Sequence, residues 1–296
     1  MRGDTGKGED DHIGPHVPPA EAKETNRHCP VSLVLRATLI HDDSMRHANP
    51  FVVAGLLWLT PASGPREAQL KFGPDAISIE RSHAYLQRHA APDYWRLSPY
   101  YVPQETDSAC SVASITMLLN ALRGLPALNE DEVLTQAGVL HAVASERWTM
   151  QTAENGSGVT FAELSRYVRL SLNAFRLGAD IEVWKPADHF VATLKKLRQM
   201  LVANERADRD IVLAYFNQGV LTGSWDGPHI SPIAAYDAGR GQILIMDVDR
   251  KWYIPYWASD DKLIEAMLRP APASRGALAG ETGGLVRVIL KSPVRH

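Results

Sequence analysis

Cys110, one of two cysteines, stands at the start of a helical pattern and is the main candidate for a reactive side chain in this sequence. The apolar residues after it recur at spacings of three and four, the period of an amphipathic helix. They are Val112, Ile115, Leu118, Leu119 and Leu122. Asp107 and Ser108 are predicted to cap the N-terminus of this helix, and Gly124 followed by Pro126 is predicted to end it.

Cys110 is predicted to be a nucleophile because it lies in the first turn of that helix. The unpaired N–H groups and partial positive charge at a helix N-terminus stabilise a thiolate, which is the reactive form of cysteine. The alternative is that Cys110 is a small buried apolar residue, since free cysteine is among the residue types most often buried.

A histidine and an aspartate in the second half of the chain can complete such a site. His229 lies at the start of one β-rich run and Asp247 at the end of the next, with a turn at 237–241 between them. Adjacent antiparallel strands bring these two ends side by side, so Asp247 can hold one ring nitrogen while the other faces Cys110. Alternatively, His229 is a hydrogen-bonded core histidine and Asp247 caps a turn.

The elements expected around these residues indicate an α+β fold. Further helices are predicted at 82–89, at 129–144 with Asn129 as its cap, at 160–168 with a capping box of Thr160 and Glu163, and at 189–204. Strands are predicted at 211–216, 230–236, 242–248 and 285–290. Val133 is expected on the inward face of the second helix. Helices that precede strands without regular alternation favour α+β over a doubly wound sheet.

Composition excludes several classes of protein. The 296 residues include 31 Lys and Arg against 34 Asp and Glu, so no nucleic-acid partner is expected. The two cysteines, Cys29 and Cys110, make neither a disulfide framework nor a paired-cysteine zinc spacing, and no His-Glu-x-x-His motif occurs. We therefore expect no metal site in the protein.

The N-terminal part of the chain is expected to lie outside the folded domain. Residues 1–44 are polar and are predicted to be a disordered tail. The apolar core of 45–64 is far shorter than the roughly 20 residues that cross a bilayer, so no transmembrane span is expected. If translation starts at Met45, this segment reads as a signal peptide of an exported or periplasmic protein. Otherwise a cytoplasmic protein is expected.

Three separated motifs make the sequence resemble the phytochelatin synthase family, in particular its short bacterial members. The motifs lie at 104–120, at 158–161 and at 227–257, and the resemblance covers about residues 70–290. It implies a catalytic domain at 70–292 and a papain-like fold, in which a helical half carrying Cys110 packs on an antiparallel sheet carrying His229 and Asp247. In that family the cysteine cleaves the Cys–Gly bond of glutathione and holds γ-Glu-Cys as a thioester.

The resemblance also implies roles for individual residues. His229 exchanges protons with Cys110 and with the departing glycine, and Asp247 fixes the tautomer of His229. Gln104 donates its amide N–H to the developing oxyanion. Arg250 matches a family arginine and is a candidate partner for the γ-glutamyl carboxylate, with a solvated surface arginine as the alternative.

The sequence departs from the family's pattern next to its two central residues. The family commonly has Tyr before and Gly after the nucleophile, where this chain has Ala109 and Ser111. Pro228 replaces the usual Gly before His229. We expect these changes to alter the walls of the site and leave the nucleophile, base and acid in place.

Two further departures bear on the acyl acceptor. The stretch 269–284 offers no clear counterpart of the aspartate and arginine that help to hold a second glutathione in the family, and the cysteine-rich C-terminal region of the plant members is absent. Both favour water as the acceptor. We therefore expect an enzyme that mainly hydrolyses glutathione, or a related γ-glutamyl peptide, to γ-Glu-Cys and glycine.

Two alternatives to this function stay open. One is phytochelatin synthesis, with γ-Glu-Cys transfer to a second, metal-bound glutathione, and the other is a non-catalytic protein that binds thiol peptides or metal thiolates. No cofactor is expected to be required, and heavy metals such as cadmium or zinc would enter as thiolate complexes of the substrate. A homodimer is compatible with this interpretation.

Overall fold

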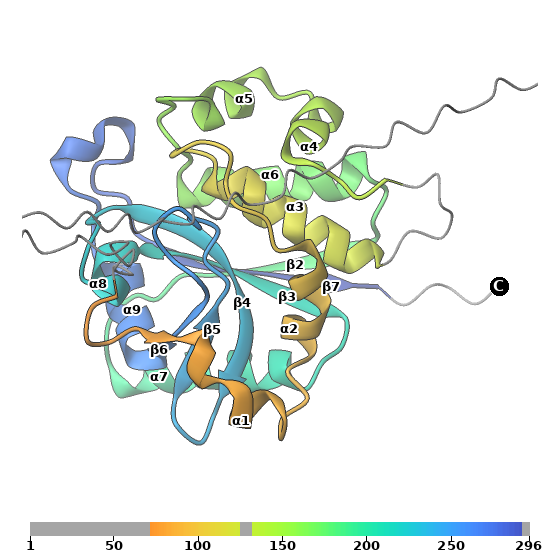
Figure 1. The fold of residues 1–296 in the computed structure, drawn as a ribbon. Coiled ribbons are helices and arrows are strands. Elements are labelled where there is room, and N and C mark those ends of the chain that lie inside the picture. Colours follow the sequence, from red (N-terminus) through yellow and green to blue (C-terminus); the bar gives the residue numbers. More distant parts are fainter. Residues whose placement is uncertain (1–71, 125–131, 292–296) are drawn as a thin grey trace, which may run out of the picture. The chain divides into compact units, whose positions relative to one another are not determined.

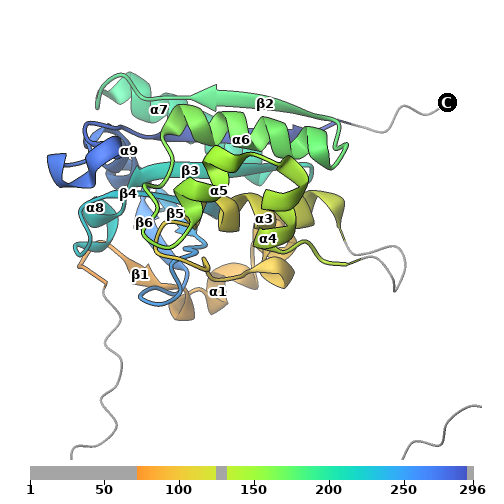
Figure 2. The ribbon, with the colours of Figure 1, turned by 90° about the horizontal axis from the view of Figure 1, so that it is seen from above.

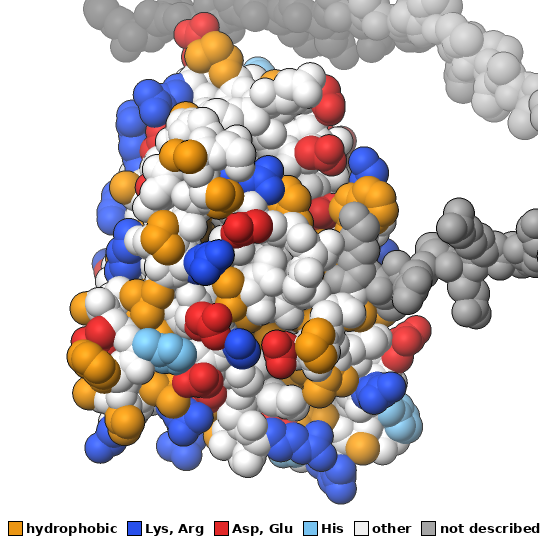
Figure 3. Space-filling model, turned by 90° about the vertical axis from the view of Figure 1, so that its left-hand side faces the viewer, with side chains coloured by type: hydrophobic (Ala, Val, Ile, Leu, Met, Phe, Trp, Pro, Cys, Tyr) orange, Lys and Arg blue, Asp and Glu red, His pale blue; other side chains and the backbone are white. Residues whose placement is uncertain are grey.

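The computed structural model describes residues 72–124 and 132–291. The predicted tail at 1–44, the apolar segment at 45–64, Cys29 and the Asn129 cap lie outside these residues. Within the described ranges, no helix is both long enough and apolar enough to cross a membrane. On the face shown in Figure 3, acidic and basic side chains lie interspersed, and neither sign gathers into a large patch.

A seven-stranded antiparallel sheet forms the centre of the described part of the chain (Figure 1). Its order is β1-β6-β5-β4-β3-β7-β2. The strands are β1 (Ile77–Ser78), β2 (Ala179–Trp184), β3 (Asp210–Asn217), β4 (Pro228–Asp237), β5 (Gln242–Ile245), β6 (Tyr256–Ser259) and β7 (Gly284–Leu290). The four strands predicted from the sequence are confirmed, although β5 ends at Ile245, before Asp247.

The helices within the described residues follow one another between these strands. They are α1 (His83–Leu86), α2 (Pro92–Leu97), α3 (Cys110–Arg123), α4 (Gln136–Val143), α5 (Glu146–Thr152), α6 (Phe161–Ala174), α7 (Val191–Glu205), α8 (Gln218–Thr222) and α9 (Asp260–Leu268). Three short 3-10 helices, η1 (Ile79–Arg81), η2 (Ser98–Tyr100) and η3 (Ala273–Leu278), complete the set. This mixture of helices with one antiparallel sheet confirms the α+β class.

Strand β3 is buried on both faces and divides the interior into two cores. Its residues 211, 213 and 215 pack with α3 and α6 in one core, whereas 212, 214 and 216 pack with α7 and α9 in the other. Because successive side chains of a strand point to opposite faces, one short apolar run serves both cores. The sheet is therefore covered by helices on both sides, as the view in Figure 2 shows.

The predicted helix after Cys110 is confirmed as α3, but its surroundings differ from the prediction. Every residue from 111 to 122 is buried, so α3 is a central helix rather than an amphipathic one. Its polar side chains find partners inside, and the Ser114 hydroxyl, for example, donates to the carbonyl of Ile230 at 2.9 Å. The sequence pattern suggested an amphipathic helix because Ser and Thr count as polar, but polar side chains that are hydrogen-bonded inside the protein can be buried.

Of the two predicted ends of α3, the C-terminal one is confirmed and the N-terminal caps are not. Gly124 ends the helix with φ at 79°, a conformation that glycine adopts without strain. The N-cap position is Ala109, which offers no capping side chain, so the predicted caps are wrong. Ser108 instead donates to the carbonyl of Gly156 at 2.6 Å, and Asp107 pairs with Lys251.

Two other helix predictions have opposite outcomes. The capping box of Thr160 and Glu163 at the start of α6 is confirmed, with both reciprocal hydrogen bonds present. The helix predicted at 129–144 begins only at Gln136, where the Thr135 hydroxyl accepts from the backbone N–H of residue 138. Because residues 132–135 precede the helix, Val133 is 49% exposed rather than inward-facing.

Candidate active site

Cys110, His229 and Asp247 come from three separate elements and meet at one end of the β4–β5 hairpin. Cys110 is the first residue of α3, His229 is the second residue of β4, and Asp247 follows the end of β5 by two residues. Nε2 of His229 lies 2.8 Å from Oδ1 of Asp247. Cys110 lines the same cavity as His229 and is close enough to raise the pKa of the His229 ring. The structure thus brings together the three residues that the sequence predicts as a unit.

Asp247 is a fully buried carboxylate that several donors hold. Its Oδ1 also accepts from the backbone N–H of Asp249 at 2.9 Å. Its Oδ2 accepts from Nε2 of Gln218 at 2.8 Å and from the Tyr256 hydroxyl at 3.1 Å. Burial by itself raises the pKa of this carboxyl, but the charge of His229 and the hydrogen-bond donors outweigh it and lower the pKa. Asp247 is therefore held as an anion.

The His229 ring is fixed so that Nδ1 is the nitrogen left to face Cys110. Nε2 lies 3.0 Å from the Ser231 hydroxyl as well as close to Asp247, and the ring meets that of Phe216 edge-on. Burial by itself lowers the pKa of His229, but Asp247 and then Cys110 outweigh it and raise the pKa well above its usual value. Asp247 and Cys110 therefore both favour positive charge on this ring.

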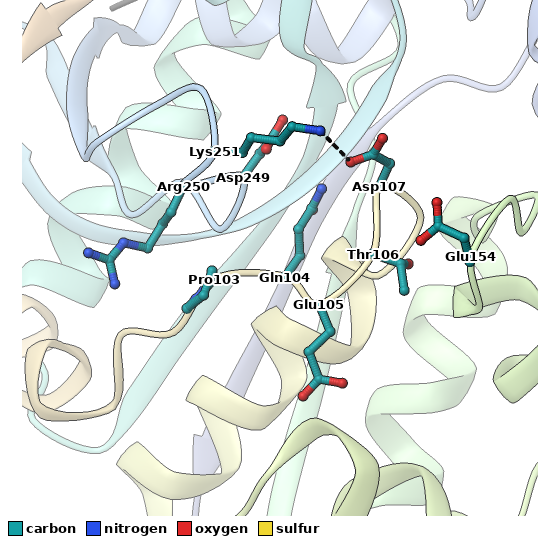
Figure 4. A pocket seen from close by; sticks show the side chains of 9 residues that line it. All are labelled: Pro103, Gln104, Glu105, Thr106, Asp107, Glu154, Asp249, Arg250 and Lys251. Atoms are coloured by element: carbon teal, nitrogen blue, oxygen red, sulfur yellow. Dashed lines mark ion pairs between the residues drawn. The ribbon is translucent and has the colours of Figure 1, made fainter. Parts of the chain in front are cut away.

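Gln104 lies on the loop before α3 and is tied to the segment that contains Asp247. Its backbone N–H donates to the carbonyl of Val248 at 2.8 Å, and the Tyr101 hydroxyl donates to the carbonyl of Asp247. The side-chain Oε1 of Gln104 is buried and has no hydrogen-bond partner among the described residues. Figure 4 shows its amide nitrogen pointing toward the Asp249 side of a cavity. An N–H aimed this way is available to a bound group.

Three cavities adjoin these residues. The central cavity, of about 220 Å³, is lined by Gln104, Asp107, Cys110, Gln218, Trp225, Pro228, His229, Asp249, Trp252 and Tyr253. The glycine-loop cavity, of about 550 Å³, is also lined by Cys110 and extends over residues 154–159 and 274–278. The charged cavity, of about 530 Å³, is lined by residues 103–107, 249–251 and Glu154 (Figure 4). Cys110 therefore lies between the first two cavities.

Comparison with known proteins identifies the family of this chain. The phytochelatin synthase family model matches residues 78–276, more than half of the chain. This chain belongs to the phytochelatin synthase family. It is 26% identical over 182 residues to glutathione gamma-glutamylcysteinyltransferase 3 of Lotus japonicus, an alignment that covers 59% of this chain and 34% of the relative.

Relatives from a second plant give the same result. The chain is 25% identical over 190 residues to glutathione gamma-glutamylcysteinyltransferase 1 of Arabidopsis thaliana. This alignment covers 62% of this chain and 35% of the relative. Transferase 2 of the same plant is also 25% identical over 190 residues, with 37% of it covered. The chain thus spans about a third of the length of the curated relatives that it matches.

Two residues that hold Asp247 in this family member were not found by sequence reasoning. Tyr256 lies in β6 within the third motif, so the motif carried a signal that was not used. Gln218 begins the short helix α8, and neither its spacing nor its neighbours in sequence indicate a role. Both donors become visible only when the sheet brings β6, β5, β4 and β3, which leads into α8, side by side.

The two arginines near the site line different cavities. The Arg250 guanidinium carbon lies 4.6 Å from the centre of the Tyr101 ring, and Arg250 lines the charged cavity but neither cavity that Cys110 lines. Arg275, in the stretch where the sequence offered no clear counterpart, lines the glycine-loop cavity. It stacks on Trp225 at 4.1 Å and donates to the carbonyl of Asp226.

The described residues contain no cluster of three or more His, Cys, Asp or Glu side chains arranged to hold a metal ion. The Cys110 side chain is a free thiol that is partly exposed. A partly exposed sulfur that lines the same cavity as a histidine can act as a nucleophile on a bound carbonyl group.

Proposed function

We propose that this protein is a papain-like cysteine enzyme that cleaves the Cys–Gly bond of glutathione, or of a related γ-glutamyl thiol peptide, through an acyl-enzyme. The observation that carries this proposal is that Cys110, Gln104 and a His229 hydrogen-bonded to Asp247 line one cavity. The names of the relatives supply the substrate class. A helix-borne cysteine packed on an antiparallel sheet supports the papain-like assignment.

In the first half of the reaction the Cys110 sulfur attacks the carbonyl carbon of the Cys–Gly bond. His229 takes the thiol proton through Nδ1 and passes it to the glycine nitrogen as the C–N bond breaks. Asp247 keeps the ring oriented and stabilises its positive charge. Glycine departs, and γ-Glu-Cys remains bound to Cys110 as a thioester.

In the second half water attacks the thioester carbonyl carbon. His229 now removes a proton from the water, the C–S bond breaks, and Cys110 is regenerated with γ-Glu-Cys released as a free acid. In both halves negative charge develops on the carbonyl oxygen. The Gln104 amide and the backbone N–H of Cys110 are the proposed donors to that oxygen, and loss of one such donor typically lowers the rate by about 10² to 10³.

The two ends of the substrate are proposed to occupy different cavities. The departing amine must lie within reach of His229, which lines the central cavity and not the glycine-loop cavity. The γ-Glu-Cys part then extends into the glycine-loop cavity, whose volume falls in the range of about 300–1,000 Å³ usual for small-molecule sites. Arg275 in this cavity is a candidate partner for the glutamyl carboxylate. Arg250 is a candidate partner only for a group bound in the charged cavity.

Hydrolysis is proposed as the main outcome because the chain lacks a clear counterpart of the family residues that hold a second glutathione. Transfer of γ-Glu-Cys to another glutathione, the reaction in the names of the relatives, is the alternative. We propose that no cofactor takes part in either reaction and that cadmium or zinc enters as a thiolate complex of the substrate.

The test is mass spectrometry of the products after incubation with glutathione, with and without cadmium. γ-Glu-Cys and glycine alone are the expected products. Longer (γ-Glu-Cys)n-Gly chains would show that the enzyme transfers γ-Glu-Cys to glutathione instead of hydrolysing the thioester. Cys110→Ala is expected to abolish both, and Gln104→Ala to slow the reaction about 10²- to 10³-fold. If wild type made neither product above the Cys110→Ala background, the enzymatic proposal would be wrong.

Alkylation with iodoacetamide then separates an enzyme from a binding protein. The proposal requires Cys110 to react faster than a free thiol near neutral pH and requires His229→Ala to remove that advantage, because the thiolate is the reactive form. Sluggish alkylation that His229→Ala does not change would favour a thiol-peptide binding protein.

A further inference from the structure

A glutamine in the wall of the central cavity has one polar atom without a partner. Gln218 lines this cavity and neither of the other two, and the residue is only 1% exposed. Its Oε1 makes no hydrogen bond with any described residue. Oε1 of Gln104 is sealed in the interior without a partner, whereas Oε1 of Gln218 is not sealed in this way. The cavity is therefore the space onto which this acceptor opens.

Charge fixes which end of the Gln218 amide is the oxygen. An amide can be turned by 180° with little change in shape, so its hydrogen-bond partners decide its orientation. Nε2 lies 2.8 Å from Oδ2 of Asp247, a buried carboxyl whose pKa is lowered, so it is an anion. An anion needs a donor at that distance, and an amide oxygen there would be repelled. The N–H end must face Asp247, which leaves Oε1 for the cavity.

The backbone of Gln218 keeps the side chain beside His229. Gln218 begins α8, and its N–H donates to the carbonyl of Gly227 at 3.0 Å. Its carbonyl accepts from the Thr222 hydroxyl at 2.9 Å. The Gln218 and His229 side chains also bind the two oxygens of one carboxylate, Oδ2 and Oδ1 of Asp247, each at 2.8 Å. The acceptor therefore has a fixed place next to the histidine.

Gln104 and Gln218 give the central cavity the complement of a peptide bond. A peptide group presents one acceptor, its C=O, and one donor, its N–H. Gln104 is the proposed donor to the carbonyl oxygen, and Oε1 of Gln218 is an acceptor in the wall of the same cavity. Because the departing nitrogen must come within reach of His229, its N–H lies on the side of the cavity where Gln218 is held.

We propose that Gln218 is a catalytic residue whose Oε1 accepts a hydrogen bond from the N–H of the scissile Cys–Gly bond and then from the departing amine. The nitrogen enters with one hydrogen and leaves with two, because His229 supplies the second as the C–N bond breaks. Gln218 transfers no proton, and its bond to the first hydrogen turns the nitrogen lone pair toward His229. This inference rests on the proposed function, since it assumes that the Cys–Gly bond is cleaved beside His229.

The test compares glutathione with its ester analogue, in which glycolic acid replaces glycine and an oxygen atom replaces the scissile N–H. Only the amide can donate to Gln218. Gln218→Met keeps the approximate size of the side chain and removes both of its polar ends. We expect this variant to lower kcat/KM for glutathione about three- to tenfold more than kcat/KM for the ester, the effect of one neutral hydrogen bond.

Tyr256→Phe is the matched control for the loss of a donor to Asp247. The Tyr256 hydroxyl donates to the same Oδ2 at 3.1 Å, but Tyr256 lines none of the three cavities. A less well held Asp247 affects both variants, whereas contact with the leaving nitrogen belongs to Gln218 alone. The amide-to-ester ratio in Tyr256→Phe is therefore expected to stay within about twofold of the wild-type ratio.

The ratio of the two rates is the readout, because a general loss of activity cancels from it. A ratio that Gln218→Met leaves unchanged, or that Tyr256→Phe lowers equally, would overturn the inference, while cleavage of glutathione by wild type would still support the proposed function. If Gln218→Met fails to fold, Gln218→Lys, which keeps an N–H donor for Asp247 and removes the acceptor, must lower the same ratio. Cleavage of neither substrate by wild type would overturn the proposed function and this inference together.

Discussion

The Tyr256→Phe variant tests whether Asp247 depends on its buried donors. The Tyr256 hydroxyl donates to Oδ2 of Asp247 at 3.1 Å, and both side chains are fully buried. Burial and then Asp247 raise the pKa of Tyr256 well above its usual value, so the hydroxyl keeps its proton and its role as donor. Removing this oxygen leaves Asp247 with one donor fewer, in a place that bulk water does not reach.

The size of the effect follows from this burial. A hydrogen bond to a charged group contributes about 1.5–3 kcal/mol, and the absence of replacing water favours the upper part of that range. For a domain of this size each kcal/mol lowers the unfolding midpoint by about 2–4 °C, so a fall of roughly 3–12 °C is expected. Because Gln218 and the Asp249 amide remain, the rate of Cys110 alkylation is expected to fall by less than about tenfold.

Thermal unfolding and iodoacetamide kinetics measure the two effects. Tyr253→Phe is the matched control, because the Tyr253 hydroxyl is also buried but shares only a neutral hydrogen bond of 3.3 Å with Thr222. That bond is expected to contribute about 0.5–1.5 kcal/mol. A midpoint for Tyr256→Phe equal to or above that of Tyr253→Phe would refute the view that buried donors hold Asp247 as an anion.

Two further outcomes follow from the structure. Thr160→Ala removes the capping box of α6 and is expected to destabilise the protein by about 0.5–2 kcal/mol in urea unfolding, and no loss of stability would mean that the cap adds nothing. The second concerns pH: His229 has a raised pKa in the folded protein, so its contribution is complete below the unfolded value of about 6.5 and is lost as pH rises through the folded value. The midpoint difference between wild type and His229→Gln should therefore shrink from pH 6 toward pH 9, and a difference that grows would contradict this reasoning.

The sequence predicts the parts of the site that lie on regular elements. Cys110 begins a segment with helical period, and His229 and Asp247 flank a predicted hairpin, so the hydrophobic pattern makes them candidates, and the resemblance to the family implies their roles. Gln218 and Tyr256 instead come from an element of five residues and one of four, too short to show a period. Their role depends on tertiary contacts that no local pattern contains.

The same limit explains the errors at helix ends. Asp107 and Ser108 are good capping types, yet the loop before α3 is held by other contacts, and these place Ala109 at the cap. Thr106, for example, donates to the carbonyl of Thr152 at 2.7 Å. Tertiary hydrogen bonds of this kind override local capping preferences at α3. At α6 they do not, because Glu163 keeps its capping bonds while it also accepts from Arg147 and Gln151.

The departures from the family's pattern have different consequences once they are placed in the structure. Ser111 is fully buried and accepts a hydrogen bond of 3.0 Å from the Trp148 indole, so it belongs to the packing of α3 rather than to a cavity wall. Ala109 is likewise buried and lines none of the three cavities described here. Pro228 lines both cavities that Cys110 lines.

Only one of the three substituted positions, Pro228, therefore lines a cavity that would hold the substrate. His229, proposed to protonate the leaving amine, is hydrogen-bonded to Asp247 inside the protein, whereas Pro228 lines the two cavities proposed to hold the substrate. If the proposed function is correct, the proline at position 228 should affect how the substrate fits more than how the thioester forms.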